Sequence, residues 1–295
     1  MSVAGQDLIA APAAGTRPTH ALPASARRPR RPLRRSTFWA VLEEIPRPLQ
    51  ISLTLVSVLT PLLLWEALHL SGAVDRIFLP GPDAVVRAAV DMVSSGVLLD
   101  DTLASVQRIA LGFGIAVLIS VPLGLAMGTF RSVQALFEPM IGLIRYMPAT
   151  AFVTLLLIWL GLGEPPKVAL IVIGTVFFNT LMTANVVWQL PRELIKVSFT
   201  LGAGGFTVFR KVIFPYAVPG MIDSMRVNLA AAWNLIVVAE VLAADRGLGY
   251  RIVRAQRFLH IEQIFVVLAT IGILGLASDV ALRRLRDRLA PWAQS

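Results

Sequence analysis

The sequence contains no cysteine and only three histidines among its 295 residues. Without cysteine, a disulfide framework and thiolate metal ligands are excluded. The histidines, His20, His69 and His260, lie far apart and lack the spacing of metal ligands. We therefore expect no metal site in this chain.

Charged residues are also scarce. They make up 15% of the chain, against about 25% in a soluble domain, whereas hydrophobic residues make up 56% and the mean hydropathy is +0.72. A helix needs about 20 apolar residues to cross about 30 Å of hydrocarbon. We predict an all-α polytopic membrane protein with about six transmembrane helices: Ile51–Leu70, Ile109–Gly128, Pro139–Gly161, Val168–Trp188, Val227–Leu242 and Ile264–Leu282.

Basic residues are unevenly distributed, because eight of the 27 lie before residue 48. That stretch is rich in proline, alanine and serine, which is typical of a disordered segment. No apolar run in it precedes a small-residue cleavage site, so it does not resemble a secretory signal peptide. We expect residues 1–48 to form a disordered basic cytoplasmic tail, and we attribute the net charge of +9 to membrane orientation rather than to nucleic-acid binding.

The other basic residues indicate the orientation of the predicted helices. An even number of spans places both termini in the cytoplasm, where Arg131, the segment 192–211 and the arginines within 283–288 also fall. The segment between the last two spans is an exception, since it carries four arginines between 246 and 257 and would face outward. Either this segment folds back on the protein or the last span is misplaced.

Residues 49–100 are expected to hold the first span and an extracytoplasmic amphipathic helix. Pro82 suits the first turn of that helix, which continues over residues 83–95. Its apolar residues recur at helical spacing: Val86, Ala89, Val90 and Val93. The segment is too short and too charged to cross a bilayer, so we place it on the outer surface.

Gly124 and Gly128 lie one turn apart in the second predicted span. Small residues at this spacing allow another helix to approach closely. That helix can belong to the same chain or to a second copy, and we expect packing within the chain.

The most informative stretch is the predicted cytoplasmic segment 191–220, PRELIKVSFTLGAGGFTVFRKVIFPYAVPG, which is too long for a plain turn. Leu194, Val197 and Leu201 form one apolar stripe, and a second stripe lies within 206–213. Gly202 can supply the left-handed residue that ends a helix, and Pro215 is expected to block continuation. We predict two short helices folded over a glycine-rich turn, an element able to transmit force to a docking protein.

This segment resembles the EAA loop of binding-protein-dependent ABC permeases. The resemblance rests on Glu193, Gly202, Ile213 and Pro215, with Gly202-Ala203 at the family's Gly-Ala turn, although Leu194-Ile195 replace its paired alanines and Phe214 replaces its leucine. In that family the turn forms a coupling helix that fits a groove in the ATP-binding subunit. The resemblance therefore implies a role in ATPase coupling for Glu193, Gly202, Ala203, Gly204, Phe206, Phe209, Arg210, Ile213 and Pro215.

The wider resemblance covers residues 75–285 and is closest to the nitrate/sulfonate/taurine/bicarbonate branch of these permeases. It rests on short pieces in a fixed order: Phe78-Leu79-Pro80-Gly81-Pro82, Leu111-Gly112-Phe113, Val121-Pro122-Leu123-Gly124, Leu160-Gly161-Leu162-Gly163-Glu164, Ala232-Trp233, Ala239-Glu240 and Gly247-Leu248-Gly249-Tyr250. It implies the type-I ABC importer permease fold over residues 101–286, with the coupling loop at 191–220, in the bacterial inner membrane.

The resemblance also implies partners. Members work as two permease copies, commonly identical, with two ATP-binding subunits and an extracytoplasmic solute-binding protein. The chain has no GxxxxGK[ST] phosphate loop, so ATP and Mg²⁺ are expected on the partner ATPase, with no cofactor on this chain. The implied function is that of a permease subunit, not an enzyme, that translocates a small anionic solute such as nitrate, a sulfonate, taurine or bicarbonate.

Polar residues in or near the spans are candidates for the translocation pathway, because such groups are costly in lipid. They are Arg145, Arg226, Trp233, Asn234 and Glu240. Each has a structural alternative: the arginines can reach the membrane interface, and Trp233 and Asn234 can bond neighbouring helices. For Glu240 we favour an ion pair with Arg246 or Arg251. No nucleophile–base set can be assembled, so no catalytic residue is assigned.

Two other classes of protein stay open. An ion-coupled secondary transporter needs acidic or histidine residues buried in mid-span, and Glu240 is the nearest approach. A membrane-embedded enzyme needs His, Asp or Glu clustered on facing helices, and the sequence shows no such cluster.

Overall fold

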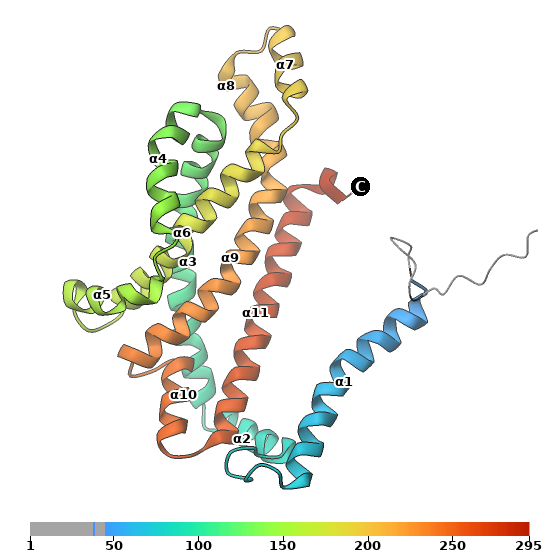
Figure 1. Cartoon of the computed structure of the whole chain (residues 1–295), viewed down its shortest axis with the longest axis vertical. Helices are drawn as coiled ribbons and strands as arrows, with labels where there is room; N and C mark the ends of the chain where they lie inside the picture. The colour runs from blue at the N-terminus through green and yellow to red at the C-terminus, as the bar shows by residue number, and fades with distance from the viewer. Residues whose placement is uncertain (1–37, 39–44, 295) are drawn as a thin grey trace, which may run out of the picture. The chain divides into compact units, whose positions relative to one another are not determined.

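The computed structural model describes residue 38 and residues 45–294, and the described residues fold almost entirely into helices (Figure 1). The all-α prediction is therefore confirmed, whereas most of the predicted basic tail, residues 1–48, lies outside the described residues. The chain divides into two compact units, Met1–Thr60 and Pro61–Ser295. The second unit contains all the elements from α2 onward.

The first predicted span is α1, Arg47–Ser71, which has no buried residue. Its C-terminal turns belong to the second unit. There Trp65 stacks on Phe265 with ring centroids 5.1 Å apart and donates its indole N–H to the Pro80 carbonyl at 3.0 Å. His69 Nδ1 lies 2.9 Å from the Leu79 carbonyl oxygen. These contacts join the end of α1 to the loop before α2.

The predicted amphipathic helix is α2, Pro82–Ser94, and Pro82 does occupy its first turn. Its buried residues are Ala88 and Met92. Most of the predicted apolar stripe, Val86, Val90 and Val93, is exposed. The stripe therefore faces away from the protein, as expected for a helix that lies on a membrane surface.

Three long helices form the centre of the second unit: α3 (Val97–Thr129), α6 (Pro165–Trp188) and α9 (Phe214–Ala243). Glycines set the distance between α3 and α6. A Cβ at Gly124 would lie 2.5 Å from the Thr180 carbonyl oxygen, and one at Gly128 would lie 2.5 Å from Val187 Cβ. The expected packing of this glycine pair within the chain is confirmed.

The third predicted span, Pro139–Gly161, is wrong as a continuous helix. The structure has α4 (Arg131–Ile144), then the 3₁₀ turn η2 (Ala149–Phe152) and α5 (Val153–Leu160), bent by 81°. The break lies at Pro148, which has no N–H to donate and forces the preceding residue out of the helical region. Five described helices are long and apolar enough to cross a membrane, and the bent pair brings the number to six if it is one span.

The coupling segment forms α7 (Arg192–Thr200) and α8 (Gly205–Val208), and the chain ends in α10 (Leu248–Arg257), α11 (Ile261–Leu289) and the 3₁₀ turn η4 (Pro291–Gln294). Within the second unit, α7 and α8 lie at one end, and α2 and α10 lie at the other (Figure 1). The arginine-rich α10 folds back against α9 and α11. Of the two explanations for its arginines, the one in which the segment folds back on the protein is therefore confirmed.

Candidate functional site

The turn between α7 and α8 has the geometry expected of the glycine-rich turn. Gly202 follows α7 in the left-handed conformation, with φ of 80°. Its N–H donates to the Phe199 carbonyl at 2.9 Å, and the Ala203 N–H donates to the Ser198 carbonyl at 3.0 Å. This pair of bonds defines a Schellman motif. The predicted left-handed conformation of Gly202 at the end of the helix is confirmed, and backbone hydrogen bonds fix the direction of the turn.

An exposed apolar surface covers the outer side of this turn. Leu194, Val197 and Leu201 lie on one side of α7 at 3.6 residues per turn, and all three are exposed, Leu201 by 81%. Phe206 of α8, on the other side of the turn, is 76% exposed. We call these four residues the apolar corner. Large apolar side chains gathered on a surface are typical of a contact site for another protein.

Two other candidate coupling residues point into the protein. Ile213 is buried together with Val208, Leu190 and Met221, and Phe209 packs against that cluster. The two candidate coupling phenylalanines, Phe206 and Phe209, thus have opposite environments. Among the remaining candidates, Ala203 and Pro215 are half-buried, and the exposed ones are Glu193, Gly204 and Arg210.

The expected helix break at Pro215 is wrong. Residues Phe209–Ile213 form one π turn, in which the Phe214 N–H donates to the Phe209 carbonyl, and the helix continues through Pro215 as α9. The π turn is wider than an α-helical turn, so the helix accommodates Pro215, which has no N–H. As a result the apolar helix runs over Gly205–Leu242, so the helix that holds the fifth predicted span begins well before Val227, and α8 is continuous with it.

The candidate pathway residues fall into different environments. Arg145 is exposed at the end of α4, with its guanidinium carbon 4.7 Å from the Tyr146 ring centroid. Asn234 is exposed on α9 and donates to the Ala230 carbonyl at 3.1 Å. Trp233 is buried in the main hydrophobic cluster, and its indole nitrogen has no hydrogen-bond partner among the described residues. Arg145 and Asn234 are therefore accessible, whereas Trp233 is a packing residue in this conformation.

Arg226 joins α9 to α11. Its Nε lies 2.7 Å from Asp279 Oδ1, and its Nη1 lies 2.7 Å from Asp223 Oδ1. Arg286 adds an ion pair to Asp223 at 3.0 Å, and Arg283 adds one to Asp279 at 3.0 Å. A guanidinium held between two carboxylates attracts a passing anion weakly, so these ion pairs favour a structural role for Arg226, different from the membrane-interface role given as its alternative.

Glu240 forms an ion pair, as expected, but the predicted partners are wrong. Its Oε1 lies 2.7 Å from Arg108 Nη1, and the two side chains are 0% and 2% exposed. Ser105 Oγ and the Gly249 N–H also donate to this carboxylate. Arg251 instead pairs with Asp101 at 2.6 Å. A buried carboxylate with this many partners is well suited to a structural role.

Arg108 binds a second carboxylate with the other side of its guanidinium. Its Nε and Nη2 donate to Glu164 Oε2 and Oε1 at 2.6 and 2.7 Å, and Lys167 Nζ lies 3.3 Å from Glu164 Oε1. The hydrogen bonds from Arg108, helped by the charges of Arg108 and Lys167, lower the pKa of Glu164 to about 2 against the opposing effect of burial. We call Asp101, Arg108, Glu164, Lys167, Glu240 and Arg251 the ion cluster. It ties α3, α6, α9 and α10 together.

Sequence reasoning missed Arg108, Asp101 and the acidic partners of Arg226. One signal was available, since Arg108 lies directly before an apolar run, where an unpaired charge is costly. A buried polar layer was missed as well: Asn179 of α6 donates to Ser120 of α3 at 2.6 Å. Among the described residues, no group of three or more potential metal ligands is present.

These features define the chain as a multi-pass α-helical membrane protein with exposed apolar side chains on the α7–α8 turn at one end. Residues 120–294 match the family described as binding-protein-dependent transport system inner membrane component. The chain belongs to this family.

Known relatives agree with the family. The chain is 37% identical over 230 residues to a probable ABC transporter permease protein of Brucella abortus (strain 2308), covering 78% of this chain and 91% of the relative. It is 32% identical over 253 residues to the taurine transport system permease protein TauC of Escherichia coli (strain K12), covering 84% and 92%. A solved amino acid ABC transporter with histidines superposes with a TM-score of 0.57 at 16% identity, over 68% of this chain and 97% of that chain.

The chain is therefore a permease subunit of an ABC importer with the type-I permease fold. It is a transport subunit rather than an enzyme, and ATPase activity lies in separate subunits of such importers. The family decides against the ion-coupled secondary transporter and the membrane-embedded enzyme. Glu240 fits this outcome, because its carboxylate is held by Arg108.

Proposed function

We propose that two copies of this chain form the membrane-spanning part of a bacterial importer, with two ATP-binding subunits in the cytoplasm and a solute-binding protein outside. Both termini lie in the cytoplasm. The distribution of charge supports this orientation: Arg131, the basic residues of 192–211 and those of 283–288 are cytoplasmic under it. At the opposite end, Asp101 neutralises Arg251.

The apolar corner is the observation that carries the proposal. Four large apolar side chains at the end of a bundle are costly to expose to water, and the groove of an ATP-binding subunit would cover them. Glu193, Gly202, Gly204 and Arg210 are exposed on the same segment, while Phe209 and Ile213 anchor the segment in a buried cluster.

Movement of the corner reaches the membrane through α8 and α9. Because the helix over Gly205–Leu242 is continuous, a displacement of the corner on ATP binding shifts the whole span. The exposed Asn234 on α9 and Arg145 at the break after α4 are the pathway residues that we assign. ATP and Mg²⁺ act on the partner subunits, with no cofactor on this chain.

The transported solute is a small anion of the sulfonate or taurine type. TauC supports this class by its name and its 32% identity. Arg145 supplies a cationic group at the pathway. Nitrate and bicarbonate are competing small anions.

Co-expression with a candidate ATPase and a candidate binding protein from the same genome tests the proposal. We expect an equimolar complex of permease and ATPase. We also expect proteoliposomes to take up labelled taurine only when ATP is present on the ATPase side of the membrane. Replacement of the apolar corner by serine should abolish both. Stable assembly after that replacement would contradict the docking role, and uptake of bicarbonate or nitrate alone would contradict the solute assignment.

A further inference from the structure

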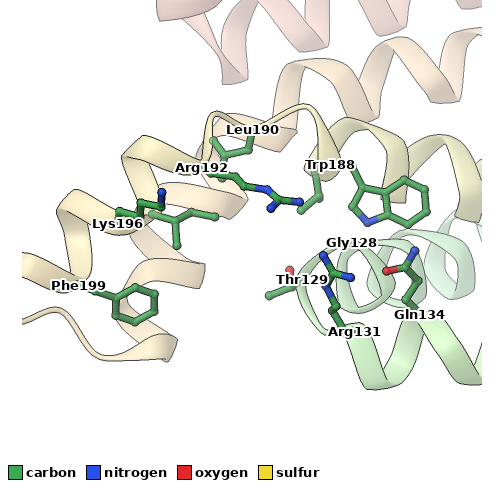
Figure 2. Close-up of a pocket in the computed structure, with 11 residues that line it drawn as sticks. Gly128, Thr129, Arg131, Gln134, Trp188, Leu190, Arg192, Lys196 and Phe199 are labelled. Carbon is green, nitrogen blue, oxygen red and sulfur yellow. The ribbon is translucent and has the colours of Figure 1, made fainter.

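A basic pocket lies behind α7, between the α3–α4 corner and the α6–α7 corner (Figure 2). Its volume is about 620 Å³. The eleven lining residues include three cations, Arg131, Arg192 and Lys196, and no aspartate or glutamate. In Figure 2 the guanidinium groups of Arg131 and Arg192 extend from opposite walls toward the middle of the pocket.

The three cations are not neutralised within the described part of the chain. Arg226, Arg251 and Arg108 each have a carboxylate partner, but Arg131, Arg192 and Lys196 form no ion pair with any described residue. Like charges that converge on one cavity repel one another, so an anion between them is stabilising.

The pocket offers further groups that suit an anion. Thr129 Oγ1 is buried without a hydrogen-bond partner among the described residues, and Thr129 lines the pocket. Helices α4 and α7 both begin at its rim, at Arg131 and Arg192, and neither has a side-chain N-cap. The positive ends of two helix dipoles therefore add to the three charges.

The pocket is separate from the docking surface. The pocket and the apolar corner use opposite sides of α7. The side facing the pocket carries Arg192, Ile195, Lys196 and Phe199, and the other side carries Leu194, Val197 and Leu201. A ligand in the pocket would thus bridge α7 to the ends of the spans without covering the apolar corner. It would hold the coupling helix in place from behind.

We propose that this pocket binds a phosphate group and thereby stabilises α7 against the membrane domain. Two arginines with a lysine match the bidentate, charge-assisted recognition of phosphate oxygens. Apart from Gly128 and the amide of Gln134, the remaining lining is apolar or aromatic: Val187, Trp188, Leu190, Ile195 and Phe199. A lipid headgroup and a free phosphate compound are the two sources of such a group, and the mixed lining at the ends of spans favours the headgroup of an anionic lipid. The cytoplasmic position of the pocket rests on the proposed function.

The test uses the full chain in nanodiscs, with binding as the readout rather than transport. One arm measures retention of phosphatidylglycerol by native mass spectrometry, in discs of phosphatidylcholine with phosphatidylglycerol. The other arm measures binding of radiolabelled inorganic phosphate and glycerol phosphate by equilibrium dialysis, in discs of phosphatidylcholine alone. The test variant is Arg131→Gln with Arg192→Gln. The matched control is Arg284→Gln with Arg288→Gln, which removes the same charge from exposed positions of α11.

We expect the test variant to bind about tenfold more weakly than the wild type, in the lipid arm or in the phosphate arm, and the control to bind normally. Loss in the first arm identifies a lipid headgroup, and loss in the second identifies a soluble phosphate compound. Arg131→Lys with Arg192→Lys should retain partial binding, which separates loss of charge from misfolding. Equal binding by wild type and test variant in both arms would overturn the proposal.

Assembly with the ATPase separates this proposal from the docking role. The test variant should still co-purify with the ATPase, because the apolar corner is intact. If the variant loses the ATPase while its phosphate and lipid binding is unchanged, the cations belong to the subunit interface and the proposal fails. If transport fails in every variant but the binding difference persists, the pocket stands and the proposed function does not.

Discussion

Arg108 and Glu240 lie 132 residues apart in the sequence and meet at 2.7 Å in the interior, at the centre of the ion cluster. Because Arg108 also binds Glu164 through two hydrogen bonds, a single guanidinium links α3 to α9 and to the loop before α6. The stability of this end of the bundle therefore depends on one residue.

Removing either member of the buried pair should be strongly destabilising. Arg108→Gln leaves Glu240 without its cation, and Glu240→Gln leaves part of the guanidinium unpaired. Each should lower the free energy of unfolding by about 3 kcal/mol. The double variant should lose less than the sum, because neither charge is then left alone. Unfolding of the detergent-solubilised protein measures these values.

An exposed ion pair provides the control for this comparison of single and double variants. Arg87 and Asp83 pair on the surface of α2, with side chains 73% and 70% exposed, so Arg87→Gln should change stability by less than about 1 kcal/mol. Strictly additive effects of the Arg108 and Glu240 replacements would contradict the pairing.

The turn after α7 should tolerate alanine at one glycine and not at another. Gly202 has φ of 80°, whereas Gly204 has φ of −74°, and a Cβ at either position meets no atom within 4 Å. Gly202→Ala should therefore cost about 1 kcal/mol from backbone strain alone, and Gly204→Ala should be neutral. Faster amide hydrogen exchange at the end of α7 in the first variant would show the effect. The same exchange rate in both variants would count against it.

Replacements of Phe206 and Phe209 should separate coupling from stability. Phe206→Ala removes an exposed side chain of the apolar corner, so it should reduce transport-coupled ATPase activity and leave the melting temperature unchanged. Phe209→Ala removes packing from the buried cluster, so it should lower stability by about 2 kcal/mol. The assignment would be wrong if Phe206→Ala destabilised the protein as much as Phe209→Ala does.

Local patterns in the sequence were sufficient to predict the first, second, fourth and sixth spans, the amphipathic helix and the turn at Gly202. Apolar runs and glycine chemistry act over a few residues, so they can be recognised without a fold. The bend at Pro148 shows the limit of this reasoning. Length and hydropathy favoured one straight helix over Pro139–Gly161, but the helix breaks before Pro148 into two bent parts. At Pro215 the opposite error occurred: a helix break was predicted, but the helix continues through Pro215 because of a single π turn at Phe209–Ile213.

The ion cluster could not be predicted, because its partners are distant in the chain. Local reasoning paired Glu240 with arginines a few residues away, but the fold brings it to Arg108 and leaves Arg251 to Asp101. Two of the short pieces that carry the family resemblance, Ala239-Glu240 and Gly247-Leu248-Gly249-Tyr250, do meet there, since the Gly249 N–H donates to Glu240 Oε2 at 2.8 Å. Sequence order alone does not reveal that contact.

Glu164 should make stability depend on pH. Its pKa falls from 4.5 to about 2 in the folded state because Arg108 and Lys167 favour the charged carboxylate. A lowered pKa contributes stability above the unfolded-state value, and that stability is lost as the pH falls from about 4.5 toward 2. The contribution is small, because the side chain is 48% exposed.

The variant Glu164→Gln isolates this contribution. At neutral pH it should melt at a lower temperature than the wild type, and the difference should shrink as the pH falls below about 4. A difference in melting temperature that stays constant down to the lowest pH at which the protein folds would contradict the assigned cause.

Site-directed labelling of the apolar corner tests the central claim most directly. The chain has no cysteine, so a maleimide that cannot cross membranes labels only an introduced one. Leu201→Cys lies on the apolar corner, and Leu162→Cys, at a residue 86% exposed before α6, serves as the control on the opposite side. We predict that in inside-out vesicles Leu201→Cys is labelled without the ATPase and protected when the ATPase is bound, while Leu162→Cys is labelled only in right-side-out vesicles. Equal labelling of Leu201→Cys with and without the bound ATPase would contradict the proposal that this corner is the coupling surface.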